Sequence, residues 1–124
     1  MKLQESAEMY LETILILSKK SPAVRSVDIA EALDYKKPSV SVAMKKLREN
    51  GFIAMGKDGH ITLTEKGREV AETIYERHNL FANWLVQLGV DQKTAARDAC
   101  RIEHVISVQS FDAIKKHVLG AKES

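Results

Sequence analysis

Apolar residues recur at intervals of three and four along most of the chain, which is the spacing of helices that bury one face. In the first fifty residues this pattern predicts three helices, over 6–19, 26–33 and 38–50. The positions expected to face a core in these helices are Tyr10, Ile14, Leu17, Ile29, Leu33, Val40, Met44 and Leu47. Pro38 suits the first turn of the third helix, where an amide hydrogen is not needed, and Gly51 suits the position after its end.

Two short apolar runs follow within residues 51–64, on either side of Lys57-Asp58-Gly59. An Asp-Gly pair between apolar runs favours the tight turn of a β-hairpin. Two helices joined by a short turn and followed by a hairpin are typical of a winged helix-turn-helix. The third predicted helix would then be the recognition helix that contacts DNA.

The second half of the chain predicts three further helices. The first covers residues 64–88 and ends at Gly89, and Asp91 and Ser107 are expected to cap the next two. The stripe positions of the long helix are Ile74, His78, Phe81, Leu85 and Leu88. These helices lie outside the winged motif and must bury their stripes elsewhere. A homodimer interface would do so, because palindromic DNA is read by twofold-symmetric proteins.

The expected fold class is therefore mainly α, with a winged helix-turn-helix domain over residues 1–66 and an all-helical dimerisation domain over residues 67–124. No run of about 18 apolar residues occurs, and the N-terminus lacks the apolar core of a signal peptide, so neither a membrane span nor a membrane partner is expected. A single cysteine excludes an internal disulfide, which fits a cytoplasmic protein.

Charge changes this picture only through its distribution. The whole chain carries a net charge of +2, but residues 35–68 hold eight Lys and Arg against three Asp and Glu, a net +5. Isolated surface lysines are usually only solvated, whereas a basic recognition helix and hairpin together favour DNA binding. The residues expected to contact DNA are Lys36, Lys37, Pro38, Ser39, Ser41, Val42, Lys45, Arg48 and Lys57.

Candidate chemistry is concentrated in the segment DACRIEHVI. Cys100, Glu103 and His104 stand at i, i+3 and i+4, so their side chains share one helix face. Taken alone, the cysteine would be a small core residue and the other two surface residues. His78, however, interrupts an apolar stripe, where it needs a polar partner or a metal. Met9 offers a further donor on the first helix.

Two other functions can be weighed from the same residues. A hydrolase with Cys100 as nucleophile and His104 as base is not expected, because a thiol in mid-helix has no free backbone N–H groups beside it to hold an oxyanion. The chain is therefore not expected to be an enzyme. A metal-free winged-helix regulator that senses oxidants through Cys100 stays open.

The segments EMYLETI, DIAEAL, KPSVSVAMKKLRENGFI, ITLTEKGREVA, RHNL and DACRIEHVIS occur in this order along nearly the whole chain. Together they resemble the diphtheria toxin repressor family of metal-dependent transcriptional regulators, which has an iron-responsive branch and a manganese transport regulator branch. The resemblance implies a winged-helix domain, a helical metal-binding and dimerisation domain, and a metal site formed from both. We expect a short form without the C-terminal SH3-like domain of the iron-responsive branch.

The family's metal positions carry a mixed set of donors in this chain. The metal ligands that the resemblance implies are Met9, Glu12, His78, Cys100, Glu103 and His104. All except Glu12 and His78 match the activating site of the iron-responsive branch. In the manganese regulators an aspartate stands in place of Met9 and a glutamate in place of Cys100, and residues matching Glu12 and His78 also bind metal.

Donor chemistry favours one metal over the others. Thioether and thiolate are soft donors, whereas manganese prefers carboxylate and carbonyl oxygen. Met9 with Cys100 therefore favours Fe²⁺, with Mn²⁺ as the runner-up and Co²⁺, Ni²⁺ or Zn²⁺ as substitutes in vitro. We expect a homodimeric repressor that controls metal-ion homeostasis by binding a palindromic operator in double-stranded DNA, with no small organic substrate.

The ancillary metal site of the iron-responsive branch is not expected here. Ala82 and Ala96 stand where that branch has a glutamate and a histidine, and alanine offers no donor. A second site built partly from Glu12 and His78 stays open, as does a manganese-responsive regulator of the same family.

Overall fold

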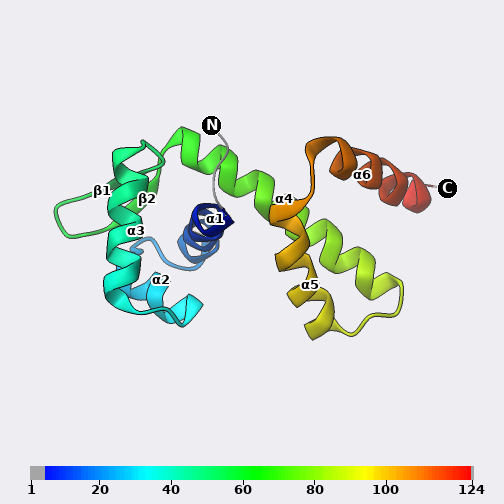
Figure 1. Cartoon of the computed structure of the whole chain (residues 1–124), viewed down its shortest axis with the longest axis horizontal. Coiled ribbons are helices and arrows are strands. Elements are labelled where there is room, and N and C mark those ends of the chain that lie inside the picture. Colours follow the sequence, from blue (N-terminus) through cyan, green and yellow to red (C-terminus); the bar gives the residue numbers. More distant parts are fainter. Residues whose placement is uncertain (1–4, 124) are drawn as a thin grey trace. The chain divides into compact units, whose positions relative to one another are not determined.

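The structure is a computed structural model that describes residues 5–123 (Figure 1). Within this range the chain forms helices and one two-stranded antiparallel sheet. The elements are α1 (Glu5–Lys20), α2 (Ser26–Leu33), α3 (Lys37–Glu49), β1 (Ile53–Met55), β2 (Ile61–Leu63), α4 (Glu65–Gln87), α5 (Gln92–Val105) and α6 (Val108–Glu123). The predicted mainly α fold class, with a winged helix-turn-helix followed by a helical unit, is confirmed.

The chain divides between Thr73 and Ile74 into two compact units, and α4 contributes residues to both. The first unit holds α1, α2, α3 and the β1–β2 hairpin. The second holds the C-terminal part of α4 together with α5 and α6. The domain boundary expected after residue 66 stays a prediction. Within the described residues, none of the helices combines the length and apolarity that a bilayer crossing requires.

A tight turn between α2 and α3 sets up the helix-turn-helix. Asp34 ends α2 in the left-handed conformation, with φ 57°, and the amide of Tyr35 donates to the carbonyl of Ala30 at 2.9 Å. α3 then begins at Lys37, with Pro38 in its first turn as predicted. The three positions expected to face the core from α3 are all buried: Val40, Met44 and Leu47.

The predicted hairpin forms directly after α3. Ile53 pairs with Leu63 across the antiparallel strands, and the connection includes Gly59 at φ 77°. The amide of Ile61 also donates to the carbonyl of Val24 at 2.7 Å, which attaches the hairpin to the segment before α2. This hairpin is the wing beside the recognition helix (Figure 1).

The entry into α4 depends on a glycine that the sequence pattern did not single out. Thr64 caps the helix by accepting a hydrogen bond from the amide of Gly67 at 3.1 Å, while its hydroxyl donates to the carbonyl of Gly51 at 2.7 Å. A Cβ atom at position 67 would lie 1.9 Å from the carbonyl oxygen of Phe52. Position 67 therefore allows α4 to approach the backbone of Phe52, just before β1, only because it is glycine.

The second unit packs its helices around aromatic residues. Phe81 of α4 and Phe111 of α6 meet edge to face at 5.8 Å, with Ala99 of α5 buried beside them. Asp91 caps α5 as predicted, accepting hydrogen bonds from the amides of Lys93 and Thr94. The Thr94 hydroxyl and these two amides hold the pKa of Asp91 below its usual range.

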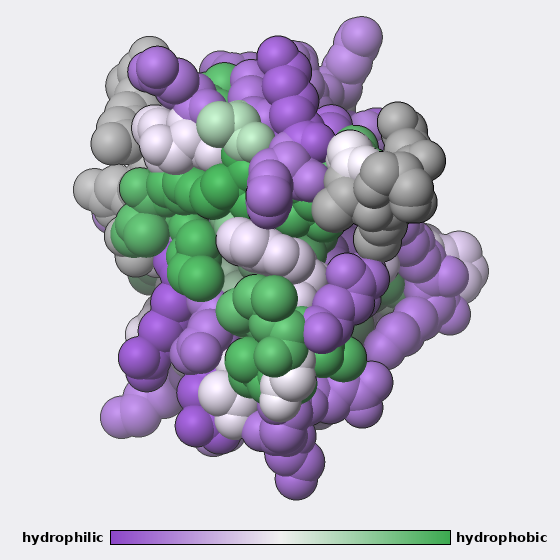
Figure 2. Space-filling model, turned by 90° about the vertical axis from the view of Figure 1, so that its right-hand side faces the viewer, coloured by the Kyte–Doolittle hydropathy of each residue, from purple (hydrophilic) through white to green (hydrophobic). Residues whose placement is uncertain are grey.

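The apolar stripe predicted on α4 is only partly buried. Ile74 and Phe81 lie in the core, whereas Leu88, which follows the end of α4, is 65% exposed in the single chain. That this part of the stripe is buried in a homodimer stays a prediction. Helical spacing identifies the residues that share one face of a helix. Here the apolar face extends beyond the part that the other helices of the chain cover. The large apolar side chains exposed in the second unit are Val86, Leu88, Val105, Val108 and Leu119. Figure 2 shows apolar side chains gathered in patches between polar ones on one face of the molecule.

Candidate DNA-binding face and metal centre

The residues expected to contact DNA are exposed. Those on α3 lie on its exposed surface, and Lys57 stands in the turn of the wing. Arg48 also reaches from α3 towards the wing, where its Nη1 atom lies 4.0 Å from the sulfur of Met55. The recognition helix and the wing therefore present their cations within one unit. That these residues contact DNA stays a prediction.

The start of α3 adds a second source of positive potential. The N-cap residue Lys36 makes no side-chain capping hydrogen bond, and the first turn contains no acidic residue. The amide groups at a helix N-terminus point outwards and carry partial positive charge, which suits a phosphate oxygen. Pro38 removes one of these amides, but Lys36 and Lys37 supply full charges at the same end.

The wing carries a contact that sequence reasoning missed. The Nη2 atom of Arg25, which precedes α2, lies 3.2 Å from Nε2 of His60 before β2. This pair places another exposed cation beside the wing. The two residues are 35 positions apart in the chain, so no local periodicity could have linked them.

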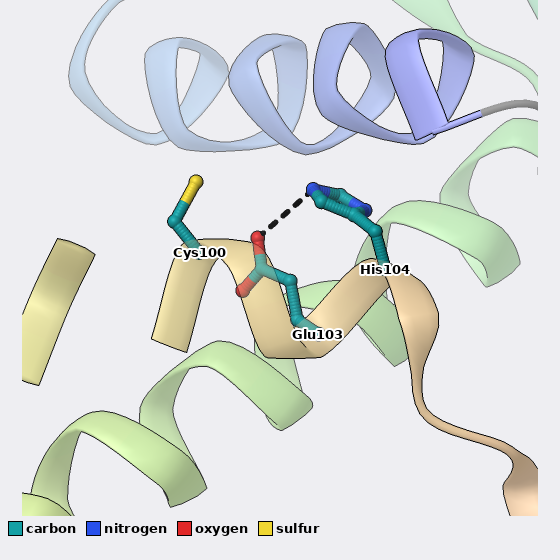
Figure 3. A group of neighbouring side chains, drawn as sticks. All are labelled: Cys100, Glu103 and His104. Carbon is teal, nitrogen blue, oxygen red and sulfur yellow. Dashed lines mark ion pairs between the residues drawn. The ribbon is translucent and has the colours of Figure 1, made fainter. Parts of the chain in front are cut away.

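The predicted cysteine, glutamate and histidine do converge on α5. The Cys100 sulfur, a Glu103 carboxylate oxygen and a His104 ring nitrogen all lie within 4.8 Å of one another. Figure 3 shows the three side chains on the same side of the helix. Their i, i+3, i+4 spacing produces this convergence directly, because residues three and four apart are neighbours on a helix surface.

Glu103 is the centre of this cluster. Its side chain is completely buried, and its two carboxylate oxygens face different imidazoles. One lies 2.9 Å from Nδ1 of His78 on α4, and the other lies 3.2 Å from Nε2 of His104. A buried carboxylate is costly unless a cation or hydrogen-bond donors compensate it. His78, which interrupts the apolar stripe of α4, thus finds a polar partner inside the second unit.

A buried arginine supports the same turn of α5. Arg77, adjacent to His78, donates from Nη1 to the carbonyl oxygens of Glu103 and Ile106, both at 3.2 Å. Its guanidinium also lies over the ring of Phe111, 5.3 Å from the centroid. Carbonyls at the C-terminal end of a helix have no partner within the helix, and a cation there is favourable. Sequence reasoning missed Arg77, because nothing in its local pattern marks a contact with α5.

The remaining predicted ligands lie on α1, in the first unit. Met9 is half-buried, and its sulfur accepts a hydrogen bond from the Tyr35 hydroxyl at 3.4 Å. Glu12 is buried and stands three residues further along the same helix. That Met9 and Glu12 share a metal site with residues of α4 and α5 stays a prediction.

A winged helix-turn-helix followed by a helical unit with a Cys-Glu-His cluster is the architecture of a metal-responsive DNA-binding protein, and the comparisons with known proteins agree. Residues 2–61 match the model of the iron-dependent repressor N-terminal DNA-binding domain, and residues 64–123 match the model of the iron-dependent repressor metal-binding and dimerisation domain. The chain therefore belongs to the diphtheria toxin repressor family of metal-dependent transcriptional repressors.

Relatives from both branches of the family are similar to this chain. The iron-dependent repressor IdeR of Mycobacterium tuberculosis is 36% identical over 86% of this chain and 46% of its own length. The regulator MntR of Lysinibacillus sphaericus is 35% identical over 96% of this chain and 86% of its own length. A solved structure of a manganese-dependent transcriptional repressor in complex with manganese superimposes with a TM-score of 0.83, at 27% identity, over 90% of this chain and 52% of that one.

These comparisons define the class of the protein. Its relatives are transcriptional regulators, so the expectation that the chain is not an enzyme is confirmed. The family supports a divalent metal, DNA and a second copy of the chain as its ligands and partners. The chain spans about half the length of the mycobacterial relative and of the manganese-dependent repressor.

Proposed function

We propose that this chain is an Fe²⁺-responsive transcriptional repressor that acts in the cytoplasm to control metal-ion homeostasis. The observation that carries the proposal is the convergence of the Cys100 sulfur, the Glu103 carboxylate and the His104 imidazole within 4.8 Å on α5. A thiolate, a carboxylate and an imidazole suit a divalent transition metal. Met9, Glu12 and His78 are proposed as further ligands because of their match to family metal positions.

The sulfur donors are the reason for preferring iron. A bound Fe²⁺ would supply positive charge to a buried carboxylate and a soft acceptor for thioether and thiolate. Manganese prefers oxygen donors, and the manganese branch has carboxylates in place of Met9 and Cys100. The later first-row divalent metals bind a given set of nitrogen, oxygen and sulfur donors at least as tightly as Fe²⁺ does. We therefore expect Co²⁺, Ni²⁺ and Zn²⁺ to substitute for it in vitro.

The protein residues have distinct roles in this proposal. Cys100 and His104 present donors from adjacent turns of α5, and Glu103 lies between His104 and His78. Arg77 holds the carbonyls of the helix turn that carries them. A ligand set held in this way needs little reorganisation on binding, which favours affinity.

Metal binding is proposed to favour the conformation of the homodimer that binds DNA. Met9 and Glu12 precede the helix-turn-helix, and the ligands on α4 and α5 follow it, so a shared site would connect α1 to the dimerisation helices. Two recognition helices can enter successive major grooves only when they are about 34 Å, or a multiple, apart. We therefore propose a palindromic operator, and repression of metal-uptake genes when metal is plentiful.

A manganese-responsive regulator is the second candidate. The observation that favours it is the contact at 2.9 Å between His78 and Glu103, since a histidine at this position is a ligand of the manganese branch. In that case the oxygen and imidazole donors would dominate. Met9 and Cys100 would then contribute little to selectivity.

An anaerobic DNA-binding titration distinguishes the two candidates. The operator would first be selected from a random duplex library with metal-loaded protein. Binding of the labelled operator would then be followed by fluorescence anisotropy while Fe²⁺, Mn²⁺ or Zn²⁺ is added to metal-free protein. We expect Fe²⁺ to activate binding at a lower concentration than Mn²⁺. The reverse order would support the manganese-responsive candidate, and tight binding without any metal would contradict both.

A further inference from the structure

A tyrosine hydroxyl joins a proposed metal ligand to the turn of the helix-turn-helix. Tyr35 lies between α2 and α3, and its hydroxyl donates to the sulfur of Met9 on α1 at 3.4 Å. Its ring also meets the ring of Tyr10 edge to face, with centroids 6.0 Å apart and an interplanar angle of 79°. All three residues belong to the first unit. Tyr35 is thus fixed to the side of α1 that carries Met9.

Burial alone does not account for this position of Tyr35. The residue is 43% exposed. A thioether is a weak acceptor, and exchanging water for it yields little energy. The contact matters more for geometry, because it ties the Met9 sulfur to the residue that precedes Lys36 and Lys37 at the start of the recognition helix.

We propose that Tyr35 is a positioning residue that holds the Met9 sulfur in the metal-free chain and competes with the metal for it. This inference rests on the proposed function, in which Met9 is a metal ligand. It assigns to Tyr35 the role of coupling the metal ligand Met9 to the start of the recognition helix, which neither the metal ligands nor the DNA-contacting residues supply. The conformation of the turn before α3 would then depend on whether Met9 binds the metal.

The competition follows from the electronic structure of a thioether. A sulfur atom that shares a lone pair with a cation has less electron density for a hydrogen bond, so the Tyr35 hydroxyl bonds it more weakly. The hydrogen bond therefore stabilises the metal-free state relative to the metal-bound state. When Met9 turns its sulfur to the metal, Tyr35 loses a tether to α1. The turn that begins the DNA-binding face is then free to adjust.

The test follows both ends of this link by NMR, in wild type and in the Tyr35→Phe variant. Each protein would carry ¹³C-labelled methionine methyls and ¹⁵N-labelled amides and would be titrated with Zn²⁺ alone, as a diamagnetic probe, without DNA. In wild type, Zn²⁺ should shift the Met9 methyl together with the amides of residues 34–36. The methyls of Met44, in the core, and Met55, in the wing, are internal controls that should not move.

The Tyr35→Phe substitution keeps the ring contact with Tyr10 and removes only the hydroxyl. The Met9 methyl resonance should change already in the metal-free variant, and the amide shifts of the turn on adding Zn²⁺ should shrink. Zn²⁺ should bind about two- to fivefold more tightly, as measured by chelator competition, because one modest hydrogen bond no longer opposes it. Equal affinity and equal amide shifts in both proteins would overturn the role of Tyr35.

A double-mutant cycle shows whether Tyr35 acts through the sulfur. Met9→Leu keeps an apolar side chain and removes the acceptor. In that background Tyr35→Phe should have no further effect on Zn²⁺ affinity, and a persisting effect would contradict the proposal. The two hypotheses also fail separately. If Zn²⁺ leaves the Met9 methyl of wild type unmoved, Met9 is not a ligand. If Met9 moves but the turn responds equally in wild type and Tyr35→Phe, only the role of Tyr35 is wrong.

Discussion

The guanidinium of Arg77 lies 3.2 Å from the backbone carbonyl oxygen of Glu103, whose own carboxylate faces His78, the residue next to Arg77. Two consecutive residues of α4 thus hold one residue of α5 by its backbone and by its side chain. The position of Glu103 is therefore set by contacts from a neighbouring helix as well as by the helix to which it belongs.

Arg77→Met should destabilise the protein and weaken metal binding. Loss of the guanidinium removes the hydrogen bonds that it donates to the carbonyls of Glu103 and Ile106. The free energy of unfolding should therefore fall by about 2 kcal/mol. Displacement of Glu103 should reduce metal affinity by about tenfold, as loss of residues that orient ligands commonly does. Urea denaturation and chelator competition measure the two effects. Arg97→Met, at an exposed position of α5, the helix that carries Glu103, is the control and should change neither.

Gly67→Ala should destabilise the first unit. The added Cβ would lie 1.9 Å from the Phe52 carbonyl oxygen, so backbone must move, at a cost of about 2 kcal/mol. Gly120→Ala in α6 is the matched control, because nothing lies within 4 Å of its added Cβ. That substitution should be neutral or slightly stabilising, since alanine favours a helix. Equal melting temperatures for the two variants would show that the close approach at Gly67 does not occur in solution.

Replacing Lys37, Lys45 and Arg48 together by alanine should weaken DNA binding and flatten its salt dependence. Each neutralised phosphate contributes roughly 0.9 to the slope of log affinity against log salt, so three phosphate contacts would lower the slope by about 3. A triple alanine variant at Lys93, Arg97 and Lys116 removes the same charge from exposed positions of α5 and α6 and is the control.

The control variant should bind operator DNA nearly as tightly as wild type, with the same slope. The measurement is fluorescence anisotropy with metal-loaded protein at several salt concentrations. If the recognition-face variant retained wild-type affinity and slope, α3 would not be the DNA-binding element.

Cys100→Ala and His104→Ala should each prevent activation at the wild-type metal concentration without disrupting the fold. Both residues contribute a donor to the cluster around Glu103, and loss of either should raise the activating metal concentration by at least about a hundredfold. Circular dichroism and sedimentation would report the fold and the dimer, and DNA-binding titrations would report activation. Activation of either variant at the wild-type metal concentration would remove that residue from the site.

Exchanging sulfur for oxygen should change metal preference. Met9→Asp combined with Cys100→Glu replaces two soft donors with hard ones and should favour Mn²⁺ over Fe²⁺. The added carboxylates attract any divalent ion, so the quantity to compare is the ratio of activating Mn²⁺ and Fe²⁺ concentrations, measured without oxygen. A ratio equal to that of wild type would show that sulfur ligation does not set selectivity.

Local periodicity in the sequence determined much of this protein. The 3.6-residue period of a helix placed Met44 in the core and Lys45 on the exposed surface of α3, and it brought Cys100, Glu103 and His104 to one side of α5. Such relationships depend only on neighbouring positions along one helix. The caps and turns were predictable for the same reason, since the Asp91 cap involves only the next three residues.

Only the tertiary structure decided which faces meet. The contacts of Glu103 with Arg77 and His78, of Tyr35 with Met9 and of Gly67 with Phe52 join residues that are distant in the chain. Periodicity marks a face as apolar or polar but does not say what packs against it, and Leu88, on the predicted apolar stripe, is exposed in the single chain. A contact between two helices depends on how side chains of both fill the shared space, and no single helix carries that information.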